Sequence, residues 1–352
     1  MNTEKSMTLK EIADKLGAKV QGDQNYKITG LRDLERLQIP ASQHKLYFIE
    51  SKKMLKKHPE VVNCPAVLTT EELASNFKNA IICEAKESRL KFIETLKLFE
   101  FQYSPTEKKS DRAYIHSAAD VHSSAIVYPG AVILEGAKIG ANSVIFPCAV
   151  IEPFAEIGEN TVIHPNVVIG YKCIIGNHCR IFGGTVIGAD GFGFYDHGDD
   201  NRHKIPQIGN VVISDNVEIG SGCTIDRATI ESTFIGEHTK LDDQVHIGHN
   251  CQIGRYIYMA GSAVLAGSVK IEDYAIIAGQ ATIAQGITIH SKAVLLGMSA
   301  TQRDIEAGAI YFGAVQAMPV KQMHRSTSHF MNLPEIVERL EKLEQKLLPT
   351  DE

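Results

Sequence analysis

The chain has 352 residues, of which 36 are basic and 42 acidic, so its formal net charge is −6. This length allows about two domains of roughly 100–200 residues, and mild acidity without a basic tract argues against nucleic-acid binding. No apolar run approaches the ~18–20 residues of a membrane helix, and the first residues hold no apolar signal segment, so we expect a cytoplasmic protein. Seven cysteines without a CxxC pair predict reduced thiols.

Residues 1–102 have the pattern of a compact α/β domain. Thr8 and Glu11 form a T-x-x-E capping box ahead of apolar residues at helical spacing, and Gly17 closes that helix. The predicted strands and second helix span 45–50, 66–70, 79–84 and 88–100. The polar segment 103–112 is predicted to link this domain to the rest of the chain.

A six-residue repeat organises the chain from Ile115 onward. Ile or Val occupies every sixth position from 115 to 187, and a small or thin residue follows each one four positions later. This period excludes an amphipathic helix. It is typical of a left-handed parallel β-helix, a narrow triangular prism in which three hexads make one coil. Residues 18 apart then stack at the strand spacing of about 4.8 Å.

Two interruptions divide the repeat, which we place at 113–303. The phase breaks at 188–207, where Gly, Asp and His replace the aliphatic residue, so a loop excursion is expected there. The repeat resumes at Ile213 and slips once after Ile225. In total, 27 hexads give about nine coils. Four cysteines occupy small-residue positions and are predicted to be buried and structural: Cys173, Cys179, Cys223 and Cys251.

The segment 304–352 has a third composition and is predicted to be helical. Ile336, Leu340, Leu343 and Leu347 follow 4-3-4 spacing with Glu and Lys between them, which is the pattern of a short coiled-coil stalk. A stalk implies self-association. A helix docked on the β-helix is the alternative.

The segment LDDQVHIGHNCQIG carries the main candidate for chemistry. It places His246 and His249 beside Asp242 and Asp243, and histidine suits a general base near neutral pH. One coil above His249 stands Gly267, whose approachable backbone N–H could stabilise an oxyanion that faces the base. An ordinary surface histidine is the alternative. No third histidine stands one coil away, so no metal site is predicted.

Several segments in combination resemble the UDP-3-O-(3-hydroxyacyl)glucosamine N-acyltransferases of lipid A biosynthesis. They are the N-terminal α/β domain, the hexads broken by IGADGFGF, then KIPQIGNVVI, NVEIGSGCTIDRATI, DDQVHIGHN and the helical tail. The resemblance implies a homotrimer with a catalytic cleft between neighbouring β-helices. It also implies transfer of a 3-hydroxyacyl chain from acyl carrier protein to the 2-amine of UDP-3-O-acylglucosamine. The carrier's phosphopantetheine is then the cofactor, and none is bound permanently.

The same resemblance implies roles at the candidate site. The family's general base falls on His249, in the motif Ile-Gly-His-Asn, and its oxyanion donor falls on the amide of Gly267. Asn250 and His246 are then expected beside the substrate, with His246 where the family often has Gln. The family's second functional histidine corresponds to Gly286 here, so its assistance is not expected.

Substrate contacts outside that motif are also implied. Phe48 is expected to stack on the uracil ring, with Ser51 and Met54 where the family has Asn and Tyr; plain domain core is the alternative for Phe48. Ala300 stands where a bulky Met can limit acyl length in the family, which implies a longer chain here unless Met298 or Leu296 fills the space. Basic residues near the end of the β-helix are expected to bind the acidic carrier protein, or else to form a solvated surface: Arg303, Lys321 and Arg325, with His324.

Three rival functions are considered. The sister O-acyltransferase that acts on UDP-N-acetylglucosamine lacks a 100-residue domain before its β-helix. Sugar-nucleotide pyrophosphorylases also carry hexapeptide tails, but they need a glycine-rich nucleotide loop near the start, which is missing here. A non-catalytic scaffold is the rival from another class, and loss or retention of acyl transfer on removal of His249 would distinguish it.

Overall fold

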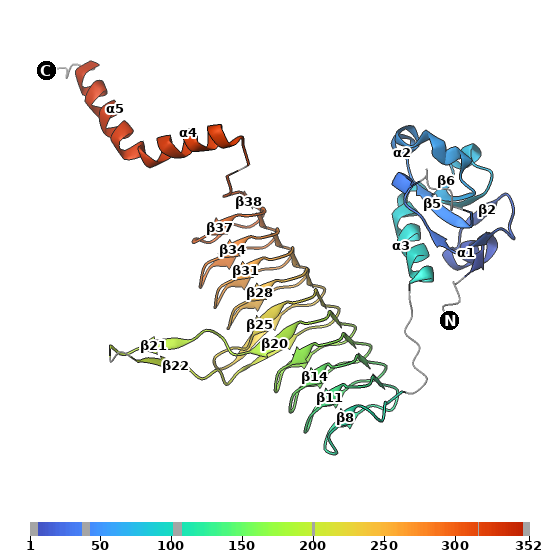
Figure 1. The fold of residues 1–352 in the computed structure, drawn as a ribbon, viewed down its shortest axis with the longest axis horizontal. Coiled ribbons are helices and arrows are strands. Elements are labelled where there is room, and N and C mark those ends of the chain that lie inside the picture. The colour runs from blue at the N-terminus through green and yellow to red at the C-terminus, as the bar shows by residue number, and fades with distance from the viewer. Residues whose placement is uncertain (1–5, 37–42, 101–107, 199–200, 316, 348–352) are drawn as a thin grey trace. The chain divides into compact units, whose positions relative to one another are not determined.

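The computed structural model describes residues 6–36, 43–100, 108–198, 201–315 and 317–347. Among these residues no helix is long and apolar enough to cross a membrane. The chain divides into two compact units, Met1–Ser104 and Pro105–Glu352 (Figure 1). The predicted boundary at residue 102 and half of the predicted linker, 103–107, lie outside the described residues.

A five-stranded mixed sheet forms the centre of the first unit. Its strands, in spatial order, are β2 (Lys19–Gln21), β7 (Ala80–Cys83), β6 (Ala66–Thr70), β5 (Lys45–Ile49) and β4 (Gly30–Leu31). Its helices are α1 (Leu9–Leu16), α2 (Lys52–Lys57) and α3 (Ser88–Phe99), and a small ribbon pairs β1 (Met7–Thr8) with β3 (Lys27–Ile28). The predicted capping box is present at the start of α1, since Thr8 Oγ1 accepts from the Glu11 amide at 3.2 Å and the Glu11 carboxylate accepts from the Thr8 amide at 2.7 Å. The sequence-based strands and helices of this unit are therefore confirmed.

A left-handed parallel β-helix dominates the second unit. Its strands, of two to four residues, form three parallel sheets of ten, ten and nine strands, from β8 (Tyr114–Ile115) to β38 (Ile310–Tyr311). Partner strands in the regular part lie 18 residues apart, as in β11 (Val132–Ile133) and β14 (Val150–Ile151). The predicted fold class is confirmed.

One aliphatic side chain per strand fills the interior of this prism. Ile133, Ile151 and Ile169 stack in successive coils and are fully buried. The four cysteines predicted at the small-residue positions are buried in the same core. Burial raises the pKa of Cys223 to about 11 and that of Cys251 to about 12, so these thiols act as core side chains and not as nucleophiles.

The β-helix continues past the predicted end at residue 303. β37 (Ala300–Thr301) and β38 extend two of the sheets, and the helices α4 (Val320–Met331) and α5 (Leu333–Leu347) begin only after them. Thr301 and Tyr311 take the inward positions of these strands. Thr301 is not aliphatic, and β38 pairs with β36 (Val294–Leu295) at a spacing of 16 residues instead of 18, so the six-residue period revealed neither strand. The segment 304–352 is therefore not helical throughout.

Both interruptions of the repeat lie at one corner of the prism. Across the first interruption, paired residues such as Ile187 and Ile225 are 38 positions apart in the sequence, which is 20 more than the regular 18. Across the second, Ile225 and Ile247 are 22 positions apart, which is four more. The first insertion lies between β20 (Val186–Ala189) and β23 (Asn210–Ile213), and the second between β25 (Thr224–Asp226) and β26 (Ser232–Ile235). β20 and β25 are neighbours in one sheet, so both insertions leave from the same edge of that sheet.

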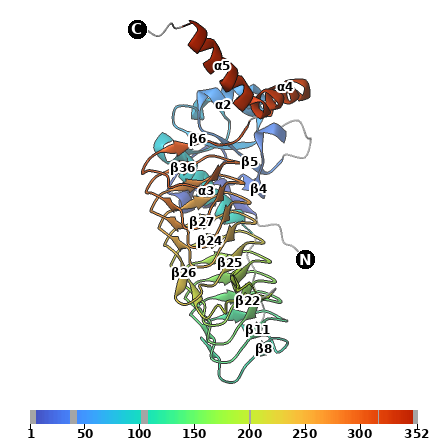
Figure 2. The same ribbon diagram turned by 90° about the vertical axis from the view of Figure 1, so that its left-hand side faces the viewer.

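We use the name insertion corner for a set of turns that follow strands of this sheet. These turns are 170–173, 188–209, 227–231, 248–251, 266–269, 284–287 and 302–304. The first insertion carries a hairpin of β21 (Phe194–Asp196) and β22 (Arg202–Lys204). This hairpin projects from the β-helix on the side of the insertion corner (Figures 1 and 2).

Candidate active site

The imidazole of His249 lies at the insertion corner between two glycines. His249 follows β28 (His246–Ile247) and is half-buried. A β-carbon added at Gly267, one coil above, would lie 2.7 Å from both Cε1 and Nε2 of this ring, and one added at Gly191, in the first insertion, would lie 2.6 Å from the His249 Cβ. Only glycine fits without displacement at either position, and the Nε2 edge of the ring faces the coil of Gly267.

The backbone at Gly267 is available for a substrate. The flanking amides are occupied, because Ala266 N–H donates to Ile283 O at 3.0 Å and Ser268 N–H donates to His249 O at 2.8 Å. Within the described residues the Gly267 N–H donates to no acceptor. The stacking that coil arithmetic predicted therefore brings an imidazole next to an amide that can donate. The roles of general base and oxyanion donor stay predictions.

Within the part of the chain that the structure describes, no hydrogen bond fixes the ring of His249. Its Nδ1 is buried and has no partner among the residues that the structure describes. In most histidine bases a carboxylate or carbonyl holds this second nitrogen. Here the packing of the ring between its glycine neighbours must set its orientation.

A carboxylate that sequence reasoning missed lies beside both histidines. His246 accepts or donates at Nδ1 with Thr224 Oγ1 at 2.8 Å, and its Nε2 lies 4.0 Å from Oδ2 of Asp226. Asp226 is 8% exposed, and this burial raises the pKa of its carboxyl, whereas His246 and His249 act to lower it and Asp190 adds to the rise. The four-residue slip hid this group, because Thr224 pairs with His246 at a spacing of 22 instead of 18.

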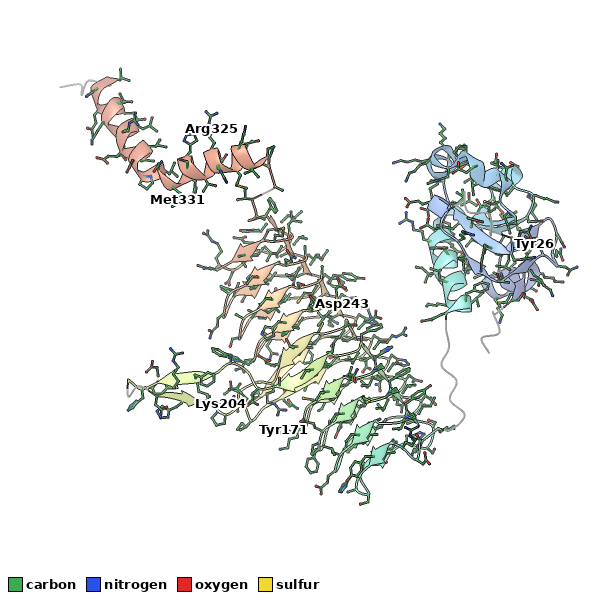
Figure 3. The ribbon with its side chains drawn as sticks, viewed as in Figure 1. Tyr26, Tyr171, Lys204, Asp243, Arg325 and Met331 are labelled. Carbon is green, nitrogen blue, oxygen red and sulfur yellow. The ribbon has the colours of Figure 1, made fainter. Side chains whose placement is uncertain are left out.

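Asp242 and Asp243 do not face the histidines, contrary to expectation. They lie in the turn after β27 (Lys240–Leu241), at a different corner of the prism. Oδ2 of Asp242 accepts from the Gly261 amide at 3.0 Å, and Oδ1 of Asp243 accepts from the Ser221 amide at 2.6 Å. Figure 3 shows Asp243 at the edge of the β-helix away from the hairpin that carries Lys204. Their carboxylates support turns of neighbouring coils.

Asn250 is held within the chain. Its backbone lies in the left-handed region at φ 64°, and its N–H donates to Thr233 Oγ1 at 2.9 Å. Its side-chain Oδ1 accepts from the Thr229 amide at 2.7 Å. Asn250 therefore joins the turn of the base to the second insertion, and its expected contact with substrate stays a prediction.

Ala300 lies on the same outward row of side chains as His246. The register runs from His246 to Val264, Thr282 and Ala300, three coils or roughly 14 Å at the strand spacing. Val264, Thr282 and Ala300 are small, so no long side chain interrupts the row between His246 and Ala300. The alternatives Leu296 and Met298 lie in the turn before β37, at another corner, and are exposed.

The predicted carrier-binding residues fall in two places. Arg303 lies at the insertion corner, directly after β37, and is exposed. Lys321 and Arg325 are exposed and four residues apart on α4, so they share one face of that helix.

Phe48 lines a hollow of about 350 Å³ in the first unit. One face of its ring stacks on Phe92, with centroids 4.4 Å apart and planes 13° apart. Ser51 is not part of the lining, because its hydroxyl caps α2 by accepting from the Met54 amide at 3.2 Å. The hollow is lined by Leu31, Arg32, Asp33, Leu34, Phe48, Met54, Phe92 and Leu96.

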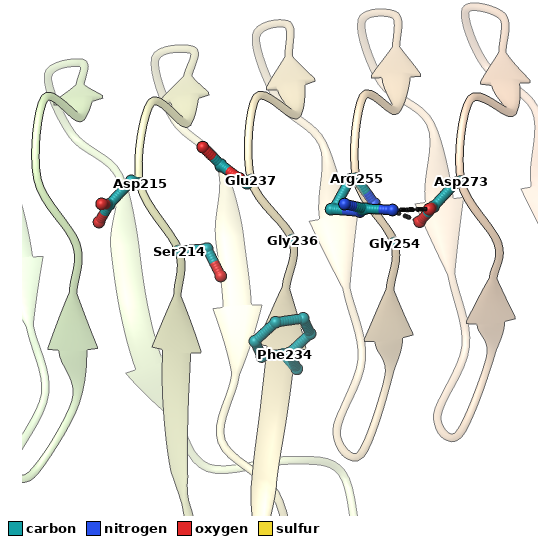
Figure 4. A pocket seen from close by; sticks show the side chains of 8 residues that line it. All are labelled: Ser214, Asp215, Phe234, Gly236, Glu237, Gly254, Arg255 and Asp273. Carbon is teal, nitrogen blue, oxygen red and sulfur yellow. Dashed lines mark hydrogen bonds and ion pairs between the residues drawn. The ribbon is translucent and has the colours of Figure 1, made fainter.

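A second hollow, of about 580 Å³, holds none of the predicted site residues (Figure 4). Arg255 and Asp273 form an ion pair of 2.9 Å at one end of it, Asp215 lies at the opposite end, and Glu237 lies between them (Figure 4). These residues follow strands of a neighbouring sheet, away from the insertion corner. In the described ranges no three His, Cys, Asp or Glu side chains group as a metal site would require.

Comparison with known proteins gives matches over nearly the whole chain and partial matches. An UDP-3-O-acylglucosamine N-acyltransferase of Coxiella burnetii (strain RSA 493 / Nine Mile phase I) is 35% identical over 339 residues, 96% of this chain and 97% of the relative. One from Dechloromonas aromatica is 50% identical over 171 residues, 49% of each chain. The GMPPB C-terminal domain family matches residues 110–191 and 203–294.

Among solved structures, UDP-N-acetylglucosamine acyltransferases show partial similarity. The Francisella novicida enzyme is 29% identical with a TM-score of 0.47, over 58% of this chain and 66% of its own. The Campylobacter jejuni enzyme is 26% identical with a TM-score of 0.47, over 59% of this chain and 84% of its own.

Proposed function

The chain belongs to the UDP-3-O-acylglucosamine N-acyltransferase family, and from this premise we propose that it attaches a 3-hydroxyacyl chain to the 2-amine of UDP-3-O-(3-hydroxyacyl)glucosamine in lipid A biosynthesis. The observation that carries the proposal is the 35% identity over 96% of this chain and 97% of the relative. That match includes the N-terminal unit, which a β-helix alone would not explain.

The proposed chemistry uses two groups of the insertion corner. The amine nitrogen attacks the carbonyl carbon of an acyl thioester while Nε2 of His249 accepts the amine's proton. The Gly267 N–H donates to the oxygen that becomes negative. The attack forms the C–N bond, and collapse of the tetrahedral intermediate restores the C=O bond, breaks the C–S bond and releases the thiol, whose sulfur takes the proton from His249. A positioned base typically contributes ~10²–10⁴ in rate, and one oxyanion donor ~10²–10³.

We further propose that the hollow beside Phe48 receives the uridine of the substrate. Phe92 covers one face of the Phe48 ring and stiffens it, which leaves an aromatic surface against which a base can stack. Arg32 and Asp33, which also line the hollow, supply the polar groups, because Ser51 is engaged as a helix cap.

The donor is proposed to be the phosphopantetheine thioester of acyl carrier protein, in the cytoplasm. The exposed basic residues Arg303, Lys321 and Arg325 support the docking of an acidic partner. The assembly is proposed to be a trimer, supported by the exposed leucines of α5.

One assay tests the function. Purified protein is incubated with 3-hydroxyacyl carrier protein and UDP-3-O-acylglucosamine, and the product is identified by mass spectrometry. We expect a diacylated sugar nucleotide with an amide. Acylation of UDP-N-acetylglucosamine instead would establish the O-acyltransferase alternative, and no transfer to either acceptor would favour a scaffold.

A further inference from the structure

The first insertion and residues 224–227 (TIDR) have no role in the chemistry proposed above, yet both lie close to the base. We propose that Arg227 is a positioning residue that orients His249 by clamping the two ends of the first insertion, with a second tie through Gln207, Thr229 and Asn250. The inference deepens the proposed function and rests on His249 as the base.

The guanidinium of Arg227 bonds both ends of the insertion. Its Nε donates to Gly188 O at 2.8 Å, where the chain leaves the β-helix, and its Nη1 donates to Gly209 O at 3.1 Å, where the chain returns. The Arg227 amide adds a bond to Ala189 O at 2.8 Å. A planar group with several donors in fixed directions can span two strands of chain in this way, and a lysine ammonium cannot reproduce that geometry.

The environment of Arg227 shows that this contact is built into the fold. The residue is 2% exposed, and its guanidinium lies 3.7 Å from the ring centroid of Tyr171, which follows β17 (Val168–Ile169), two coils below. A buried cation is costly unless it is satisfied by polar partners or an aromatic face. Its nearest carboxylate is that of Asp190, at 3.9 Å, which also pairs with Lys204 of the hairpin at 3.0 Å.

A second tie joins the returning limb of the insertion to the turn of the base. Gln207 is 4% exposed, and its Oε1 accepts from Thr229 Oγ1 at 3.1 Å. The Thr229 amide donates to Oδ1 of Asn250, the residue next to His249, at 2.7 Å. Two hydrogen bonds, with Thr229 between them, therefore link the returning limb to Asn250, the residue next to the base.

These ties hold the insertion against the Cδ2 side of the His249 ring, since a β-carbon added at Gly191 would lie 2.8 Å from both Cγ and Cδ2 of that ring. Gly191 follows Asp190 by one residue and packs on the His249 side chain, while Nδ1 of that ring has no partner among the described residues. The position of the insertion thus decides where the imidazole sits relative to the Gly267 amide. A displacement of about 1 Å in a reacting group can cost ~10²-fold in rate.

Two variants test the proposal, with one matched control. Arg227→Lys keeps the charge but cannot hold both carbonyls, and Thr229→Val keeps the shape and the amide bond to Asn250 but removes the tie to Gln207. The control is Arg255→Lys, which alters another arginine with two bonds to a neighbouring coil, at a different corner. Each variant is measured for kcat, for KM of the sugar nucleotide and for its thermal midpoint.

We expect kcat to fall by about tenfold or more in Arg227→Lys and about threefold or more in Thr229→Val, with KM changed less than about twofold. Arg255→Lys should keep kcat. Equal kcat in Arg227→Lys and wild type, or an equal loss in the control, would overturn the proposal. If Arg227→Lys does not fold, Thr229→Val decides in the same way.

A second readout separates this inference from the proposed function. The rate of carbethoxylation of His249 by diethylpyrocarbonate, followed by mass spectrometry, needs no substrate. Loosening the insertion should raise this rate several-fold at His249 and leave it near wild type at His238, which stacks on Tyr256 at another corner. If the wild-type protein transfers no acyl group but the variants still react faster at His249, the proposed function is refuted and the clamp is supported. An unchanged rate at His249 in both variants would refute the clamp.

Discussion

Gly267 and His249, one coil apart, leave no room for a β-carbon between them, because such an atom would lie 2.7 Å from Cε1 and Nε2 of the imidazole. Gly267→Ala should therefore displace the ring and lower kcat by about 100-fold. The control is Gly279→Ala, whose new β-carbon meets Gly261 O at 3.3 Å at another corner. Steady-state kinetics on both variants checks this, and a Gly267→Ala enzyme with more than about a third of wild-type kcat would contradict it.

Replacement of the proposed base should lower kcat without unfolding the protein. His249→Ala should fold normally, since the side chain is half-buried and has no side-chain hydrogen bond within the described residues, and kcat should fall by ~10²–10⁴. His246→Gln serves as the comparison and should lose much less. Retention of more than about a tenth of wild-type kcat in His249→Ala would remove His249 from the mechanism.

Asp226→Asn should gain stability while it loses activity. Burial raises the pKa of Asp226, so the folded state binds this proton more tightly than the unfolded chain does. The ionised carboxylate therefore destabilises the fold at pH above its folded pKa, and this cost disappears as pH falls through that pKa. Asparagine is neutral throughout, so the thermal midpoint should rise at pH 8, and the difference from wild type should narrow toward pH 4.

The activity of Asp226→Asn should fall, because a negative charge near His249 favours the imidazolium that forms in the transition state. Asp273→Asn should have the opposite effect on stability, since hydrogen bonds from Arg255 lower the pKa of Asp273 and its carboxylate stabilises the fold at neutral pH. Its midpoint should drop at pH 8. A lower midpoint for Asp226→Asn at pH 8 would show that the carboxylate stabilises the fold and refute the argument.

The fold could be predicted from sequence wherever one residue per hexad carries the signal. Inward Ile, Val, Leu and Met at a fixed period predicted all but two of the described strands of the β-helix, and the two that were missed hold Thr301 and Tyr311 at the inward position. The capping box of Thr8 and Glu11 likewise fixed the start of α1 from local chemistry alone. Patterns of this kind can be detected in the sequence because every coil buries the same type of side chain at the same position.

The site could be predicted only where coil spacing stays regular. His249 and Gly267 are 18 apart and were paired correctly. Asp226 was missed, because four extra residues shift its coil against that of His246. Arg227 was missed for a different reason: a sequence shows that an arginine is present but not that it is buried between the two ends of a 20-residue insertion.

Self-association should depend on α5. Leu340 and Leu343 are 54% and 53% exposed, on a helix whose Glu and Lys residues occupy the other positions. Light scattering should give about 116 kDa for the wild type, three times 38.6 kDa. Leu340→Asp with Leu343→Asp should dissociate at higher concentration than wild type, whereas Glu341→Gln with Glu344→Gln should not. An active monomer of 38.6 kDa would contradict the trimer.

Acyl length should depend on Ala300, which ends the outward row that begins at His246. Val264 and Thr282 between them are small, so an acyl chain whose thioester lies near His249 can run along this row. Methionine at residue 300 would add about three heavy atoms at its end, and each buried methylene is worth roughly 0.8 kcal/mol. We therefore expect this enzyme to prefer 3-hydroxyacyl donors longer than C14.

The measurement is a competition among C12, C14, C16 and C18 hydroxyacyl carrier proteins, with products quantified by mass spectrometry. Ala300→Met should shift the preference toward shorter chains by several methylenes while kcat with the preferred donor stays within about threefold, because the base lies three coils away and the oxyanion donor two. Thr288→Met, on the outward face of a neighbouring sheet in β35 (Thr288–Ile289), is the control and should leave the preference unchanged. A wild-type preference for C12 or C14, or an unchanged preference in Ala300→Met, would show that another residue, such as Met298 or Leu296, limits the chain.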